Sequence, residues 1–150
     1  MVDARWRVPL DTNIWISAFI NPVGPPAHVL DLYTEGHYQL VVSQPLLDEI
    51  SDVLSRPRVR RAVRFRDDWM TLWLRRLQRE AVLVAPKGNL QLCRDPKDDI
   101  VLETAILGEA DYLVSRDDDI KRDLNLIAHL REHNIAVVTV AQFLKLLGDN

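Results

Sequence analysis

Aspartates that directly follow predicted strands are the first candidates for chemistry in this sequence. Asp11 comes after an apolar stretch over residues 6–10, and Asp117 comes after another over residues 112–115. In open α/β sheets, ligands gather outside the carboxyl ends of the strands. We therefore give these two carboxylates functional weight, while one of the three consecutive aspartates that begin at Asp117 is expected to cap the next turn.

A helix predicted over residues 45–55 offers a third carboxylate. Its apolar residues form one stripe, with Asp48 and Asp52 opposite that stripe and Glu49 on its shoulder. Of these three acids, Glu49 is the one that can point along the sheet. A boundary glutamate whose stem covers the core and whose head reaches water would occupy the same position. Glu49 is therefore a candidate functional residue only in combination with the other acids.

The start of a nearly apolar helix carries further acids. Asp95 and Pro96 open this helix, which is expected to extend to about Ala110, and its first turn holds Asp98 and Asp99. Asp95 can serve as the N-cap and Asp98 as the acid of a capping box. Asp99 is left without a structural role, although attraction to the helix dipole, at roughly 0.3–1 kcal/mol, would also explain it.

Four carboxylates brought together would require cations. Two of them held about 4 Å apart repel by roughly 4 kcal/mol at an effective dielectric constant of about 20. An all-oxygen ligand set favours Mg²⁺ or Mn²⁺ over zinc. The single cysteine, Cys93, has no cysteine or histidine nearby, and we find no histidine or cysteine ligand pattern. We therefore expect Mg²⁺ or Mn²⁺ as the cofactor.

The elements that must position these acids alternate between strands and helices. Strands are predicted near residues 6–10, 38–43, 82–85, 112–115 and 135–140, and helices near residues 13–19, 29–35, 45–55, 68–80, 95–110 and 141–147. Parallel strands need helical crossovers, so this alternation predicts a three-layer α/β/α sandwich with a central, mainly parallel sheet. Asn13 is expected to cap the first helix. Pro9 would forfeit a ladder hydrogen bond, so we place it at a locally unpaired position near the end of the first strand.

Length and composition are those of one soluble domain. The chain has 150 residues with 47% hydrophobic content, enough for one continuous core, so we expect a single domain over residues 1–150. The N-terminus lacks the apolar region of a secretory signal, and no later stretch is long and apolar enough to span a membrane. We therefore expect a cytoplasmic protein with no membrane association.

Charge is segregated along the chain. The net charge is -3, whereas residues 56–79 hold nine arginines and two acids. A basic segment of this kind suits a surface that grips an anionic polymer, and a solvated basic helix face would explain it equally well. The candidate phosphate-contacting residues are Arg56, Arg58, Arg60, Arg61, Arg64 and Arg66.

Four motifs, in this order and at these separations, resemble those of PIN-domain proteins. They are Leu10-Asp11-Thr12-Asn13-Ile14, the run from Ser43 to Ile50, the run from Cys93 to Asp99 and the run from Ala110 to Asp117. The resemblance extends from about Val8 to Leu147. It is specifically to the toxin components of prokaryotic toxin–antitoxin systems, the VapC-like ribonucleases. The sequence departs from the family in having Pro9 in the first strand and a serine, Ser115, where threonine is frequent.

This resemblance implies a PIN-like fold and a Mg²⁺- or Mn²⁺-dependent endoribonuclease that hydrolyses RNA phosphodiester bonds. The acidic quartet of the family falls on Asp11, Glu49, Asp99 and Asp117, with Asn13 and Ser115 as polar helpers. Asp98 competes with Asp99 for the third position, and both stay candidate metal ligands. The implied partners are an RNA substrate and a cognate antitoxin protein, and association of two copies as a homodimer is left open.

Two rival functions follow from the same residues. An aspartate-nucleophile phosphatase also begins with a strand-end aspartate, but it requires a second acid two residues later, where this chain has Asn13. The stronger alternative is a catalytically silent PIN-like module that only binds RNA or a protein partner. The acids at all four positions argue against that module.

Overall fold

The computed structural model describes residues 5–63, 67–93, 96–116 and 124–148. The strands are β1 (Arg7–Val8), β2 (Gln39–Ser43), β3 (Val82–Val84), β4 (Tyr112–Val114) and β5 (Ala136–Val138). The helices are α1 (Thr12–Ile20), α2 (Pro25–Thr34), α3 (Gln44–Ser55), α4 (Pro57–Ala62), α5 (Asp67–Glu80), α6 (Pro96–Leu107), α7 (Leu124–Glu132) and α8 (Val140–Leu146).

The strands pair in parallel. β1, β2 and β3 pair in that order, and β4 pairs with β5. Hydrogen bonds join the two groups between β1 and β4: the N–H of Asp111 donates to the Arg7 carbonyl at 2.8 Å. Further along, the N–H of Asp11 donates to the Val114 carbonyl at 3.0 Å. The strand order is therefore β3-β2-β1-β4-β5, and the predicted parallel sheet is confirmed.

Pro9 explains why the sheet is divided at this point. Its carbonyl accepts the N–H of Val114 at 3.2 Å, so the residue is in the register of the sheet. Its nitrogen carries no hydrogen to donate back toward β4. β1 therefore ends at Val8, and β1 and β4 are joined by separate hydrogen bonds on both sides of the proline.

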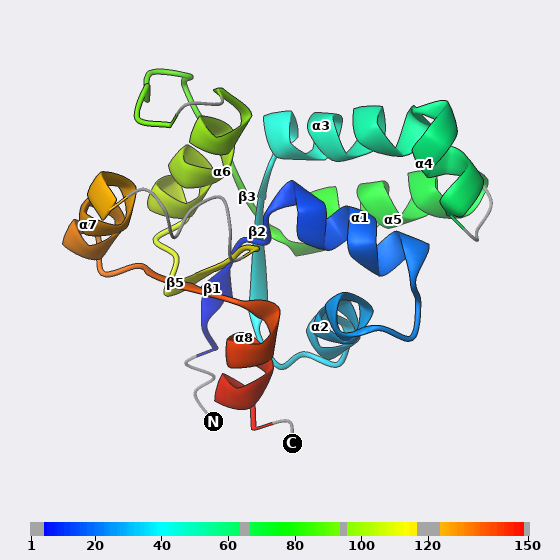
Figure 1. The fold of residues 1–150 in the computed structure, drawn as a ribbon, viewed down its shortest axis with the longest axis horizontal. Helices are drawn as coiled ribbons and strands as arrows, with labels where there is room; N and C mark the ends of the chain where they lie inside the picture. The colour runs from blue at the N-terminus through cyan, green and yellow to red at the C-terminus, as the bar shows by residue number, and fades with distance from the viewer. Residues whose placement is uncertain (1–4, 64–66, 94–95, 117–123, 149–150) are drawn as a thin grey trace.

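Helices cover both faces of the sheet, as Figure 1 shows. α1, α2, α3 and α5 lie on one side, and α6 and α7 lie on the other. Right-handed crossovers require this arrangement, because the chain moves outward from β1 to β3 in one direction and then from β4 to β5 in the other. The three-layer α/β/α sandwich predicted from the alternation is confirmed.

The core lies between the central strands and the helices that cover them. Leu10, Leu40, Val41 and Val42 are completely buried, and so are apolar residues of the flanking helices such as Ile50. Their burial fixes the positions of the loops at the carboxyl ends of the strands. Within the part of the chain described above, no helix is both long and apolar enough to cross a membrane.

Several local predictions were wrong. The first helix begins at Thr12, and its N-cap residue is Asp11, so Asn13 does not cap it. The short helix α4 was not predicted; it begins at Pro57, because proline fits the first helical position.

The predicted end of α6 was also inaccurate. The helix stops at Leu107, short of the predicted Ala110, and Leu107 is 46% exposed. It ends before Gly108, whose lack of a side chain allows close approach to β2, since a Cβ there would overlap a methyl group of Val41.

Candidate functional site

Asp11 lies where β1 runs into α1, at the carboxyl end of the sheet. Its side chain is 5% exposed, and Oδ2 accepts a hydrogen bond from the hydroxyl of Ser115 at 3.0 Å. Ser115 directly follows β4 and is 2% exposed. The two residues are separated by 104 positions in the chain, so the parallel pairing of β1 with β4 is what brings them together.

Glu49 reaches the same region from α3. The hydroxyl of Thr12, the residue after Asp11, donates to its Oε2 at 3.0 Å. Glu49 is half-buried, whereas Asp48 beside it is exposed. Asp11 and Glu49 are therefore held by residues that neighbour one another at one end of the sheet.

A buried hydroxyl pair fixes α3 and α6 against β2. The hydroxyls of Ser43 and Thr104 are 2.7 Å apart, and Thr104 also donates to the Ile100 carbonyl at 2.6 Å. The Ser43 hydroxyl is therefore the donor within the pair, and it also accepts the N–H of Leu46 as the N-cap of α3. This contact sets the positions of Glu49 and of the start of α6 relative to the sheet.

Asp99 has a structural role, contrary to the sequence prediction. It is 8% exposed, and its Oδ1 accepts the backbone N–H groups of Leu92 and Cys93 at 3.0 and 2.9 Å. Both bonds go to the same oxygen, so Oδ2 lies outside this loop contact. Asp98 in the same helical turn is half-exposed.

Glu103, one turn further along α6, acts in the same way and was missed by sequence analysis. Its two carboxylate oxygens accept the N–H groups of Lys87 and Gly88 at 2.9 and 3.0 Å. Gly88 has φ +76°, a backbone conformation that favours glycine. The i, i+4 spacing from Asp99 was the signal that placed both acids on one face of the helix.

The structure describes four of the five acids singled out as metal ligands. Asp117 lies outside the described residues, as do Arg64 and Arg66. Within the described ranges, no group of three or more histidine, cysteine, aspartate or glutamate side chains has the arrangement of a metal site. The donors that do gather are carboxylate and hydroxyl oxygens, and this chemistry fits Mg²⁺ or Mn²⁺.

The predicted polar helpers have different positions. Ser115 contacts the Asp11 carboxylate directly, whereas Asn13 is exposed on α1. Thr12, the residue between Asp11 and Asn13, is buried, and its hydroxyl is bonded to Glu49. A hydroxyl directly after a strand-end aspartate was the available signal.

The arginine-rich segment lies at the far end of α3 from the sheet, where α4 packs (Figure 1). Arg56 forms an ion pair with Asp52 at 3.1 Å, and Arg61 donates to the Pro57 carbonyl at 3.1 Å. Arg58 and Arg60 are exposed on the same short helix. The basic surface and the acidic end of the sheet are therefore separate regions linked by α3.

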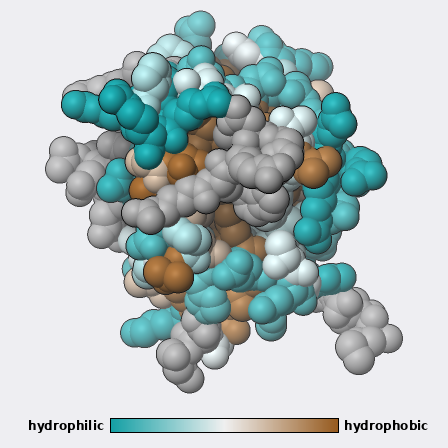
Figure 2. Space-filling view, turned by 90° about the vertical axis from the view of Figure 1, so that its right-hand side faces the viewer, coloured by the Kyte–Doolittle hydropathy of each residue, from teal (hydrophilic) through white to brown (hydrophobic). Residues whose placement is uncertain are grey.

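An apolar groove of about 580 Å³ runs between α1, α2 and α5. Phe19, Leu30 and Trp73 contribute to its lining, and Leu72 on its rim is 62% exposed. Figure 2 faces this side of the molecule and shows apolar surface between hydrophilic side chains. Exposed apolar surface of this kind is typical of contact with another macromolecule.

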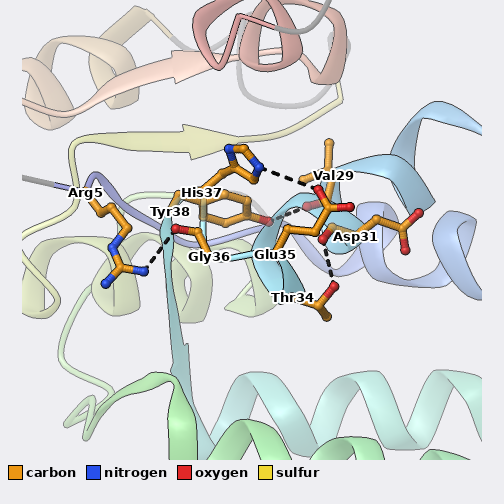
Figure 3. A network of polar contacts seen from close by, with 8 residues as sticks. All are labelled: Arg5, Val29, Asp31, Thr34, Glu35, Gly36, His37 and Tyr38. Atoms are coloured by element: carbon orange, nitrogen blue, oxygen red, sulfur yellow. Dashed lines mark hydrogen bonds and ion pairs between the residues drawn. The ribbon is translucent and has the colours of Figure 1, made fainter. Parts of the chain in front are cut away.

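A polar network closes the turn between α2 and β2, at the opposite end of the sheet from Asp11 (Figure 3). Arg5 donates to the Gly36 carbonyl at 3.0 Å, and the buried Tyr38 hydroxyl donates to the Val29 carbonyl at 2.8 Å. Burial raises the pKa of Tyr38 well above its usual value, so the hydroxyl stays protonated as a donor. We interpret this network as structural support for β2.

The sandwich, its parallel strand order and the strand-end acids define the class of protein, and comparison with known proteins identifies the family. The family model of the PIN domain matches residues 7–119, and the chain belongs to this family. PIN domains are generally nucleases, and they typically use divalent metal ions.

Two further comparisons agree with this assignment. An uncharacterized protein of Methanocaldococcus jannaschii is 29% identical over 147 residues, which cover 97% of this chain and 94% of that protein. The crystal structure of VapBC2 from Rickettsia felis, bound to a DNA fragment from their promoter, matches with a TM-score of 0.52 and 16% identity. That match covers 89% of this chain and 98% of the other chain, and at this identity it supports the fold.

Proposed function

We propose that this PIN-domain protein is a metal-dependent endoribonuclease that hydrolyses RNA phosphodiester bonds. The observation that carries the proposal is the buried Asp11 carboxylate at the carboxyl end of the sheet, held by the Ser115 hydroxyl at 3.0 Å. A buried carboxylate is costly unless it is bonded or meets a cation. Ligands of α/β sheets bind at this edge, and we expect the substrate to approach the carboxylate from there.

We assign cation binding to the acids that the sequence analysis singled out. Asp11, Glu49, Asp99 and Asp117 would hold Mg²⁺ or Mn²⁺, with Asp98 as the alternative to Asp99. When bound, a divalent cation offsets charge on the phosphodiester and activates water for attack. Ser115 fixes the orientation of Asp11, and Thr12 fixes that of Glu49, so each ligand is positioned before substrate arrives.

We assign substrate binding outside the acidic end to the arginines at 56, 58, 60, 61, 64 and 66. Neutralising phosphates with arginine supplies affinity without sequence selectivity. The exposure of Arg58 and Arg60 on α4 supports this role.

We further propose that the chain is the toxin of a toxin–antitoxin pair that acts in the cytoplasm as one PIN-like domain over residues 1–150. Two observations support a protein partner: the likeness in fold to VapBC2 and the apolar groove between α1, α2 and α5. A short neighbouring gene for a DNA-binding protein would supply the partner, and its product should co-purify with the chain. Leu72→Glu at the rim of the groove should weaken that complex, and a complex of unchanged affinity would contradict the location.

The cleavage proposal is tested with RNA, Mn²⁺ or Mg²⁺, and an EDTA control. Glu49→Gln should lose metal-dependent cleavage, whereas its neighbour variant Asp48→Asn should cleave normally, because Asp48 is exposed and bonds Gln44. Equal activity of wild type with and without EDTA would exclude the metal-dependent reaction.

A second candidate function is a PIN-like module that binds RNA or a partner without cleaving. The observation in its favour is that the described residues contain no group of three or more acids, histidines or cysteines arranged to hold a metal. RNA binding by wild type without any cleavage in Mn²⁺ would establish this function and exclude the first.

A further inference from the structure

Two histidines lie side by side at the end of α7. His129 is in the last turn of this helix, and His133 is four residues further along. Their ring centroids are 5.4 Å apart, with an angle of 56° between the ring planes. His133 lies in the turn that follows Glu132, the last residue of α7, and the short distance between the rings shows that both imidazoles face the same side of this junction.

This separation matches that of two histidines that share one metal ion. Zinc–nitrogen bonds are about 2.0–2.1 Å long, and a tetrahedral angle between two of them places the ring centroids roughly 5 Å apart. The observed separation of the ring centroids is therefore compatible with binding of one ion by both histidines.

Glu132 lies near enough to His129 to become the orienting group that histidine ligands usually have, if its carboxylate moves into hydrogen-bond distance. Its Oε2 is 3.8 Å from Nδ1 of His129, with side-chain exposures of 35% for the histidine and 72% for the glutamate. A carboxylate beside one ring nitrogen favours the tautomer whose Nε2 is free to bind a metal. His129 then presents Nε2 as a ligand while Nδ1 faces the carboxylate.

We propose that His129 and His133 form a binding site for a nitrogen-preferring divalent ion such as Zn²⁺, with water completing the coordination. Within the described residues no third side chain is arranged as a ligand, so this is a two-histidine site. Imidazole suits zinc, nickel and copper, whereas Mg²⁺ prefers oxygen ligands. This site would therefore discriminate against the cation expected at Asp11.

The location makes the site independent of the proposed nuclease centre. α7 connects β4 to β5, so it runs back from the carboxyl ends of the strands toward their amino ends. The histidines consequently lie at the end of the sheet opposite Asp11. The N–H groups of His133 and Ile135 donate to the Leu130 carbonyl at 3.0 Å each, so an ion held there would clamp the junction between α7 and β5.

The test is a Zn²⁺ titration of the full chain by calorimetry, with excess Mg²⁺ present to occupy the oxygen-ligand centre. Wild type should bind one Zn²⁺, and His129→Asn and His133→Asn should each lower the affinity at least about tenfold. The matched control is His28→Asn combined with His37→Asn, which removes the other two histidines of the chain and should leave binding unchanged.

Circular dichroism of each variant checks that the fold is retained, and Glu132→Gln should weaken binding by less than either histidine variant. The proposal is overturned if wild type binds no Zn²⁺, if His129→Asn and His133→Asn bind as tightly as wild type, or if the control pair loses binding equally. None of these outcomes depends on RNA cleavage.

Discussion

Two pairs of acidic side chains in this protein differ in what holds them. Asp11 and Glu49, near the carboxyl end of the sheet, each accept a hydroxyl hydrogen bond at 3.0 Å. Asp99 and Glu103, on α6, accept backbone N–H groups of the loop between β3 and α6 at 2.9–3.0 Å. The residue types are the same in both pairs, but the donors are different.

The donors indicate different roles for the two pairs. An ionised carboxylate has about four acceptor sites, so a carboxylate that accepts a hydroxyl hydrogen bond can also bind a cation. When backbone N–H groups donate to a buried carboxylate, the donors and the carboxylate meet each other's need for a hydrogen-bond partner. These bonds stabilise the loop without any bound ion. Asp99 fits both roles, that of a loop anchor and that of a cation ligand. Its Oδ1 accepts both loop N–H groups, and its Oδ2 takes no part in these two bonds.

The largest effect is expected from Asp11→Asn. This change removes one negative ligand and nearly preserves shape, so metal-dependent RNA cleavage should fall by at least about 100-fold while the fold is retained. Cleavage rates in Mn²⁺ and thermal unfolding without metal are the measurements. A variant that cleaves normally and unfolds at a lower temperature would show that Asp11 belongs with the structural acids.

The next comparison separates Asp98 from Asp99. Asp99→Asn keeps an acceptor oxygen for the loop but removes the charge, so it should lose most cleavage activity with a small change in stability. Asp98→Asn should retain more activity. If Asp99→Asn cleaves normally and Asp98→Asn is inactive, the metal ligand on α6 is Asp98 and Asp99 is only a loop anchor.

A purely structural effect is expected at Glu103. In Glu103→Gln one carboxylate oxygen becomes an NH₂ group, which cannot accept the N–H it meets, so one backbone donor of the loop loses its carboxylate partner. The free energy of unfolding in urea should drop by about 1–3 kcal/mol. Glu109→Gln, at an exposed position, is the control and should leave that free energy nearly unchanged. If the free energy of unfolding of the Glu103 variant is unchanged, Glu103 does not anchor the loop, and the proposed difference in role between the two pairs of acids is contradicted.

The smallest effect concerns substrate binding by the arginines. Neutralising Arg58, Arg60 and Arg61 together should weaken RNA binding across sequences and flatten its salt dependence, by a slope of about 0.7 for each single-strand phosphate that the variant no longer neutralises. Affinities at several salt concentrations, measured with EDTA to prevent cleavage, test this. An unchanged slope would mean that these side chains only cover the surface with their stems or bind a protein partner.

The sequence was a good guide to the sheet and an incomplete guide to the helices. β1 to β5 all lie where apolar stretches predicted strands, because a buried parallel strand needs such a stretch. α4 was missed because Pro57 was interpreted only as a helix end. α7 was not predicted, so the sequence analysis had no helix that would place His129 near His133.

The sequence by itself determined which acids follow strands and which lie on helices, because local periodicity sets these positions. Only the tertiary structure decided what each acid contacts. Thr12 meets Glu49 across 37 residues, and Ser115 meets Asp11 across 104 residues. Such contacts depend on strand order and crossover direction, which bring distant segments together and have no counterpart in the local pattern of residues.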